Sequence, residues 1–187
     1  MRVAILNGDP APRSPFQEYV HEVARQLAAR GHAVTTLDLA GLDLKGCSGC
    51  FGCWLKTPGE CVKRDDSAQV CRAAIQADLL LFASPMIMGF TSALLKRATD
   101  QMIPLIHPYF VMEGGEVHHL ARYAKYPRFG LLLGAECDTD AEEIEITTAI
   151  WKRTARNLKS RLVFAAVADR ITTRSAQEVA DELTAAA

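Results

Sequence analysis

Four of the six cysteines follow one another closely, at Cys47, Cys50, Cys53 and Cys61. Three thiolates at intervals of three residues can wrap an iron-sulfur cubane, and a fourth thiolate can close the set. Four thiolates also suit tetrahedral zinc, and thiols without metal are the third interpretation. We rank metal-free thiols first, a 4Fe-4S cluster second and zinc third. Cys71 and Cys137 are expected to be ordinary buried thiols.

A second candidate for chemistry is the segment 8–14, which joins an apolar run to a helix start. The free N–H groups and the dipole of a helix N-terminus attract a phosphate, and Arg13 could add a pair of donors. Ser14 and Gln17 are expected to form an S-x-x-Q capping box with Pro15 at the first helical position. The alternative is a plain connection in which Ser14 only caps the helix.

The third candidate is the Pro-containing apolar segment 84–92. A flavin needs apolar cover for its ring and backbone donors and acceptors for its polar edge, and a loop of this composition offers both. The alternative is that Met86, Ile87 and Met88 belong to the core or to an interface.

These three segments must be positioned by the strands and helices that alternate along the chain. Apolar runs predict strands over 2–7, 33–39, 78–84, 128–134 and 162–168, and helical spacing predicts helices over 14–30, 65–75, 91–102, 141–159 and 175–186. The run Leu79 to Ala83 is apolar throughout, as expected for the central strand of a sheet covered on both faces.

This alternation predicts an α/β fold, a doubly wound five-stranded parallel sheet with the flavodoxin-like strand order 2-1-3-4-5, in a single domain over 1–187. Ligands of such sheets bind beyond the carboxyl ends of the strands, where the strand order reverses, which is at the loops after the first and third strands. The segment 103–126 is predicted to be an irregular lid or dimer contact.

The charge and the apolar runs of the chain bear on whether it binds nucleic acid or a membrane. The formal net charge is −1, with Lys and Arg scattered, so no nucleic-acid partner is expected. No apolar run reaches the roughly 20 residues that span a bilayer, and the N-terminus does not read as a signal peptide. We therefore expect a cytoplasmic protein with no membrane association.

The segment Ser84-Pro85-x-x-x-Gly89-x-x-Ser92-x-x-Leu95-Lys96-x-x-x-Asp100 resembles the second flavin loop of NADPH-dependent FMN reductases, where Pro-x-Tyr-x-Gly-x-x-Ser-x-x-Leu-Lys-x-x-x-Asp is usual. The resemblance covers most of the chain and implies FMN at the carboxyl edge of the sheet, in a homodimer or homotetramer. The implied cofactor-binding residues are Asp9, Arg13, Ser14, Phe16, Gln17, Ser84, Pro85, Met86, Ile87, Met88, Gly89, Phe90, Gly134 and Glu136.

Two departures from this family stand out. Met86 and Ile87 lie where the family often carries Val-Tyr, so an aromatic contact to the flavin is missing. The family usually reads Gly-Ser-Pro-Arg in the first loop, and here Asp9 replaces the serine while Phe16 and Gln17 replace smaller polar residues. Asp9 would repel a phosphate dianion if it pointed into the loop.

The cysteine spacing resembles the iron-sulfur flavoprotein family, which carries a compact cysteine cluster after the second strand. In that family the cluster holds a 4Fe-4S centre, and the four cysteines of the 47–61 loop match its pattern position by position.

The sequence as a whole predicts an FMN-dependent NAD(P)H oxidoreductase of the flavin or quinone reductase type, which passes electrons to a small-molecule or protein acceptor. The flavin would carry the chemistry, so no catalytic acid, base or nucleophile is assigned. Two alternatives stay open: an iron-sulfur electron carrier, and a non-enzymatic redox sensor that uses the cysteine loop.

Overall fold

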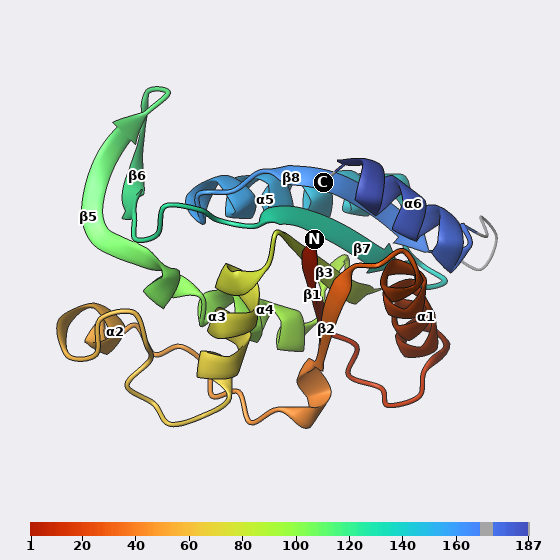
Figure 1. Ribbon diagram of the computed structural model, residues 1–187, viewed down its shortest axis with the longest axis horizontal. Helices are drawn as coiled ribbons and strands as arrows, with labels where there is room; N and C mark the ends of the chain where they lie inside the picture. The colour runs from red at the N-terminus through yellow and green to blue at the C-terminus, as the bar shows by residue number, and fades with distance from the viewer. Residues whose placement is uncertain (169–173, 187) are drawn as a thin grey trace.

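The structure is a computed structural model, and it describes residues 1–168 and 174–186. Its centre is a sheet in which five strands run parallel in the order β2-β1-β3-β7-β8, as Figure 1 shows. The strands are β1 (Arg2–Asn7), β2 (Ala33–Asp38), β3 (Leu79–Ile87), β7 (Arg128–Gly134) and β8 (Leu162–Ala168). The predicted α/β fold with flavodoxin-like strand order is confirmed.

Helices cover both faces of this sheet, because its strands are apolar on both sides. On one face, α1 (Pro15–Ala29) and α6 (Ala176–Ala186) bury Val23, Leu27 and Val179 against the sheet. On the other face, α3 (Ser67–Gln76), α4 (Ala93–Asp100) and α5 (Ala141–Asn157) bury Leu95 and Trp151 among the second core cluster. The doubly wound arrangement is confirmed.

The central strand β3 continues beyond its predicted end at Ser84 and turns back on itself. Its last residues pair antiparallel with β4 (Phe90–Thr91), so that Ile87 lies opposite Phe90. Helix α4 consequently begins at Ala93 and not at Thr91, because Ser92 is its N-cap and accepts a hydrogen bond from Leu95 N–H.

The segment 103–126, predicted to be irregular, is mostly ordered structure. After the 3₁₀ turn η2 (Ile103–Leu105), β5 (Ile106–Glu113) and β6 (Glu116–Ala121) form an antiparallel hairpin that projects from the body of the molecule (Figure 1). Gly114 and Gly115 have φ values of 58° and 79°, the positive values that a two-residue hairpin turn requires. This turn chemistry overrides the prediction of an irregular loop.

The cysteine segment contains little regular structure. It follows the 3₁₀ turn η1 (Leu39–Gly41) and contains the one-turn helix α2 (Gly52–Leu55). None of the helices in the described part of the chain is long and apolar enough to cross a membrane.

Candidate functional site

The loops after β1, β3 and β7 lie side by side at one edge of the sheet. The register pairs Asn7 with Ala83, and Pro85 with Gly134, so these three strands end at nearly the same level. The structure thus brings together the three segments from which the sequence predicted flavin contacts. Parallel sheets bind ligands at this edge, beside the point where the strand order reverses.

The turn between β3 and β4 presents apolar side chains to solvent. Met88 is 99% exposed and Ile87 42% exposed. The backbone is left-handed at both Met88 (φ 51°) and Gly89 (φ 75°), and for a residue such as methionine this conformation is uncommon and persists only where the surroundings hold it. A fixed, exposed, apolar turn of this kind can cover one face of a planar ring.

Buried polar groups hold this turn in place. Thr147 Oγ1 of α5 donates a hydrogen bond of 3.2 Å to Gly89 O, and Thr147 is fully buried. A Cβ atom at Gly89 would lie 2.9 Å from Glu143 Oε1, so α5 packs directly on the glycine. Ser84 Oγ accepts a hydrogen bond of 2.8 Å from Ser92 N–H.

The predicted residues of this segment therefore divide into two sets. Ser84, Pro85 and Met86 are buried within β3, where the Ser84 hydroxyl serves the fold. Ile87, Met88, Gly89 and Phe90 form the accessible turn.

Asp9 points into the loop between β1 and α1. Asp9 is buried, with 4% of the residue exposed. Its carboxylate accepts hydrogen bonds from Ala11 N–H, at 2.8 Å, and from the Ser14 hydroxyl. Asn7 Oδ1 accepts from Asp9 N–H at 3.2 Å. The Ser14 hydroxyl, one of the donors expected to meet a ligand phosphate, is thus bonded to a carboxylate of the chain itself.

The cap of α1 differs in one respect from the predicted capping box. Ser14 Oγ accepts from Gln17 N–H at 3.0 Å, as predicted. The Gln17 side chain, however, accepts from Arg13 N–H at 2.5 Å and not from the backbone of Ser14. The Ser14 N–H is taken, since it donates to Ala11 O at 3.3 Å. Arg13 has a left-handed backbone (φ 60°) and an exposed side chain.

The loop after β7 contacts the first loop through Phe16. A Cβ atom at Gly134 would lie 2.5 Å from Phe16 Cδ2, so the phenyl ring rests on the glycine backbone. Glu136 is exposed, and its N–H donates to Thr139 Oγ1 at 3.0 Å. Cys137, predicted to be buried, is exposed because it lies in this loop beyond the end of the strand.

Sequence reasoning missed the polar groups that support the loops. Asn7, fully buried at the end of β1, donates through Nδ2 to Asp38 Oδ1 at 2.8 Å. His21 Nε2 lies 3.0 Å from the same carboxylate. Asn7 could have been found, because it is the polar residue that ends an otherwise apolar strand, whereas Thr147 gives no such signal within its helix.

The four clustered cysteines face a common cavity of ≈ 60 Å³ in the 47–61 loop, beside Phe51, Trp54 and Lys63. Cys47 and Cys50 are exposed and Cys53 is buried, with Cys61 between these extremes. In the described ranges, no group of three or more His, Cys, Asp or Glu side chains is placed to hold a metal ion. By its chemistry, the set of four thiolates matches both an iron-sulfur cubane and tetrahedral zinc.

The thiols differ in their acidity. The pKa of Cys50 is lowered, chiefly because Gly52 N–H hydrogen bonds to its sulfur. Burial raises the pKa of Cys53 and raises that of Cys71 to about 12. Cys71 is buried, as predicted, and donates to Gln101 O at 3.2 Å.

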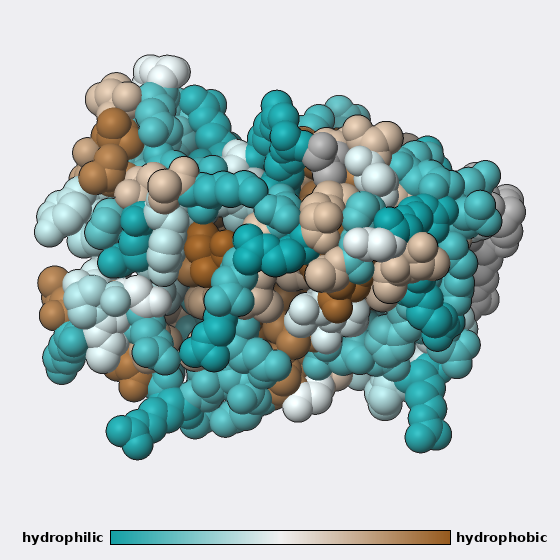
Figure 2. Space-filling model, in the orientation of Figure 1, coloured by the Kyte–Doolittle hydropathy of each residue, from teal (hydrophilic) through white to brown (hydrophobic). Residues whose placement is uncertain are grey.

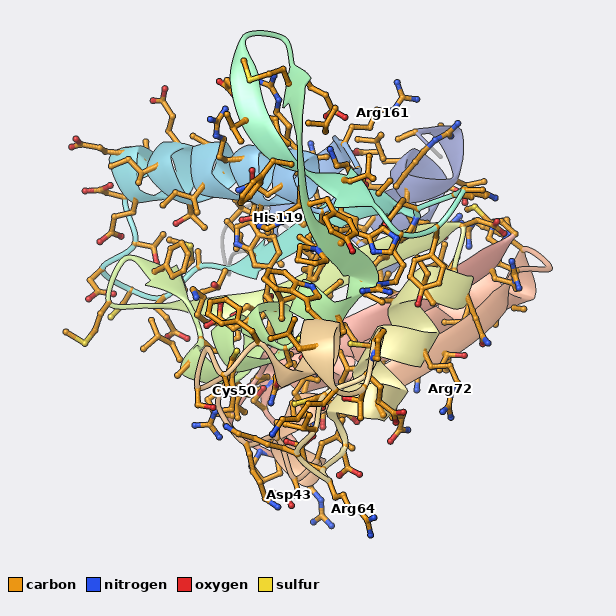
Figure 3. All side chains as sticks on the ribbon, turned by 90° about the vertical axis from the view of Figure 1, so that its left-hand side faces the viewer. Asp43, Cys50, Arg64, Arg72, His119 and Arg161 are labelled. Carbon is orange, nitrogen blue, oxygen red and sulfur yellow. The ribbon has the colours of Figure 1, made fainter. Side chains whose placement is uncertain are left out.

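Trp54 connects the cysteine loop to the hairpin. Its ring lies 5.5 Å from that of Phe51 and 5.1 Å from that of His119, and its Nε1 donates to Ile106 O at 2.9 Å. In Figure 3, Cys50 and the hairpin residue His119 face the same side of the molecule. His118, next in the strand, points the other way and is 5% exposed.

The strand order and the covering helices define a flavodoxin-like α/β protein, whose loops at the carboxyl edge of the sheet form the candidate site. The sequence profile of the NADPH-dependent FMN reductase family matches residues 1–123. The chain belongs to this family.

Individual relatives agree with this assignment. Over 105 residues the chain is 31% identical to an iron-sulfur flavoprotein of Methanocaldococcus jannaschii, a match that covers 56% of this chain and 53% of the relative. The chain spans about half the length of the curated relatives it matches.

Solved structures share the fold. An NAD(P)H:quinone oxidoreductase from Methanothermobacter marburgensis superposes with a TM-score of 0.61 at 19% identity, covering 100% of this chain and 95% of the other. An FMN-dependent NADH-azoreductase from Bacillus anthracis, solved with FMN, gives a TM-score of 0.66 at 11% identity, covering 99% and 97%.

Proposed function

We propose that this protein is an FMN-dependent NAD(P)H oxidoreductase that passes electrons to a small-molecule or protein acceptor, such as a quinone. One observation carries the proposal: the exposed turn at Met88 and Gly89, braced by Thr147, stands beside the carboxyl ends of β1 and β7. Bound FMN would supply the redox chemistry, accepting electrons from NADH or NADPH and releasing them to the acceptor.

The chain's own residues would position the flavin. Ile87, Met88 and Phe90 would cover one face of the ring, and backbone groups near Gly89, Gly134 and Glu136 would meet its polar edge. Arg13, Ser14, Phe16 and Gln17 would lie nearest the phosphate end. The turn with Ile87, Met88 and Phe90, called the ring platform below, can receive a flavin without rearrangement. In the first loop, by contrast, Ala11 N–H and the Ser14 hydroxyl are already bonded to Asp9.

Met88→Glu tests the ring platform directly. A carboxylate beneath an apolar ring must lose its water, so we expect the Kd for FMN to rise at least about tenfold. Leu55→Glu is the matched control, because Leu55 is 77% exposed at the end of α2, outside the three loops of the candidate site. FMN fluorescence quenching measures both, and NAD(P)H oxidation with a quinone should fall in parallel. Equal FMN affinity in the two variants would show that the turn at Met88 does not contact the flavin.

A second candidate function is an iron-sulfur electron carrier, because four thiols face one cavity beside the hairpin. The cluster would be held by Cys47, Cys50, Cys53 and Cys61. Anaerobic purification followed by iron analysis distinguishes the candidates: about four irons per chain indicate a cubane cluster, and iron-free protein with bound flavin indicates a reductase whose thiols serve another role.

The proposal also covers the cellular compartment and the oligomeric state of the protein. All six cysteines are free, which suits a reducing compartment such as the cytoplasm. The apolar side chains of the hairpin would pair two chains as a homodimer, or as part of a homotetramer.

A further inference from the structure

The loop between β1 and α1 offers few groups to a ligand anion. Two of its residues, Pro10 and Pro12, carry no backbone N–H, and neither does Pro15, the first residue of α1. The other N–H groups of the loop are already bonded. Gly8 N–H donates to Ala83 O of β3 (2.8 Å). The rest donate to the loop or to its two flanks: Asp9 to Asn7 Oδ1 (3.2 Å), Ala11 to Asp9 Oδ1 (2.8 Å), Arg13 to Gln17 Oε1 (2.5 Å) and Ser14 to Ala11 O (3.3 Å).

The Ser14 hydroxyl is committed in the same way. It donates its one proton to the Asp9 carboxylate and accepts from Gln17 N–H at 3.0 Å. A hydroxyl has a single proton to donate. Ser14 therefore cannot also donate to a phosphate unless Asp9 withdraws.

The Asp9 carboxylate takes the position that favours an anion. It lies before the N-terminus of α1, a 15-residue helix, where the dipole and the first N–H groups stabilise negative charge. It is also buried, at 4% exposure. The chain thus supplies its own anion where a ligand phosphate would bind.

We propose that Asp9 sets the flavin selectivity of this site, so that the 5′-phosphate of FMN adds little to binding and the flavin is held mainly through its ring. This inference rests on the proposed function and names its ligand class: exchangeable flavins, phosphorylated or not. A phosphate dianion must displace the Asp9 carboxylate or lie against it, and either costs free energy. Riboflavin, which has no phosphate, meets no such cost at the turn formed by Met88 and Gly89.

Fluorescence quenching gives the Kd of both flavins. In the unmodified protein, we expect the Kd values for FMN and riboflavin to agree within about threefold. Asp9→Ser frees Ala11 N–H and the Ser14 hydroxyl, and hydrogen bonds to a charged group are strong enough to tighten FMN binding by about ten- to a hundredfold. Riboflavin binding should not change.

Glu18→Gln is the matched control for charge. Glu18 is an exposed acid in the first turn of α1, and its replacement removes the same charge without touching the loop. FMN affinity should stay unchanged in this variant. Asp9→Asn removes the charge and keeps an acceptor for Ala11 N–H, so it should move FMN affinity in the same direction as Asp9→Ser, by less. Unmodified protein that binds FMN more than about a hundredfold tighter than riboflavin overturns the proposal.

A titration with inorganic phosphate tests the loop without any flavin. Amide NMR resonances of Ser14 and Gln17 should show no saturable shift in the unmodified protein and a saturable shift in Asp9→Ser. Saturation in the unmodified protein at low phosphate concentration would contradict the inference. Absence of flavin binding in every variant would instead refute the proposed function, while the phosphate titration still decides the role of Asp9.

Discussion

Thr147 is a buried hydroxyl whose partner is the carbonyl oxygen of Gly89, 3.2 Å away. Thr147→Val keeps the shape of the side chain and leaves that carbonyl without its donor. We expect a loss of about 1 kcal/mol in the free energy of unfolding, together with weaker FMN binding, because the turn is less firmly held. Urea unfolding and flavin titration measure the two effects.

The neighbouring Thr148 is half-buried and provides the control. Thr148→Val should leave FMN affinity unchanged. If both variants weaken FMN binding equally, the hydrogen bond to Gly89 does not position the turn.

Gly134 leaves room for the Phe16 ring. A methyl group added at Gly134 would lie 2.5 Å from Phe16 Cδ2, so Gly134→Ala must displace the ring and should cost about 1–3 kcal/mol of stability. Adding Phe16→Ala should recover much of the loss, whereas Gly41→Ala, which meets no atom within 4 Å, should cost little. Additive losses in the double variant would contradict this contact.

At the residue scale, the sequence predicted positions more reliably than orientations. Ser14 caps α1 as its S-x-x-Q pattern predicted. The inward direction of Asp9 could not be predicted, because it depends on where Ala11 N–H and the Ser14 hydroxyl lie once the loop is folded. For Cys137 the end of β7 at Gly134 was predicted correctly, and the error was to expect burial in the loop that follows.

At the scale of elements, Asp78 ties together the starts of two strands. Its Oδ2 accepts from Arg2 N–H at 2.8 Å, and its Oδ1 pairs with Lys125 Nζ at 2.6 Å. The hydrogen bond from Lys125 is the largest cause that lowers the pKa of Asp78 from its ordinary 3.8 to about 2.

The sign of the pH effect follows from this pKa. The folded protein keeps Asp78 ionised at pH values where the unfolded chain has already bound a proton, so the stabilisation is complete above pH 3.8 and is lost as the pH falls toward about 2. Asp78→Asn should therefore be less stable than the unmodified protein at pH 7, with a smaller difference near pH 2. Urea unfolding at both pH values measures this, and a difference that grows on acidification would refute the assignment.

Strands and helices with regular periodicity were predictable, and the hairpin was not recognised. The five parallel strands carry long apolar runs that only a sheet covered on both faces can bury. In the hairpin, the decisive signal is local, since Gly114 and Gly115 adopt the positive φ values of a tight turn. The extension of β3 into β4 likewise depends on Met88 and Gly89, whose left-handed backbone the apolar pattern does not reveal.

For the molecule as a whole, the proposed homodimer would form through the hairpin, which carries exposed apolar side chains. Phe110, Met112 and Val117 share one face of it by register and are 69%, 66% and 62% exposed. Figure 2 shows hydrophobic side chains on this projecting arm. Contiguous exposed apolar surface of this kind marks interaction sites.

Phe110→Glu tests the proposed assembly. A charge on this face must be desolvated on pairing, so sedimentation should show the unmodified protein as a dimer or larger and the variant shifted toward monomer. Leu55→Glu, at a position 77% exposed outside the hairpin, is the control. A monomeric unmodified protein, or a variant that assembles normally, would place the interface elsewhere.

The most direct test of the central claim is anaerobic reduction of the protein reconstituted with FMN. Addition of NADH or NADPH should bleach the visible absorption band of the oxidised flavin, and addition of a quinone should restore it. Met88→Glu, assayed at the same FMN concentration, should respond less because it binds less flavin. A flavin that stays oxidised under excess NADH and NADPH, although bound to the unmodified protein, would contradict the account.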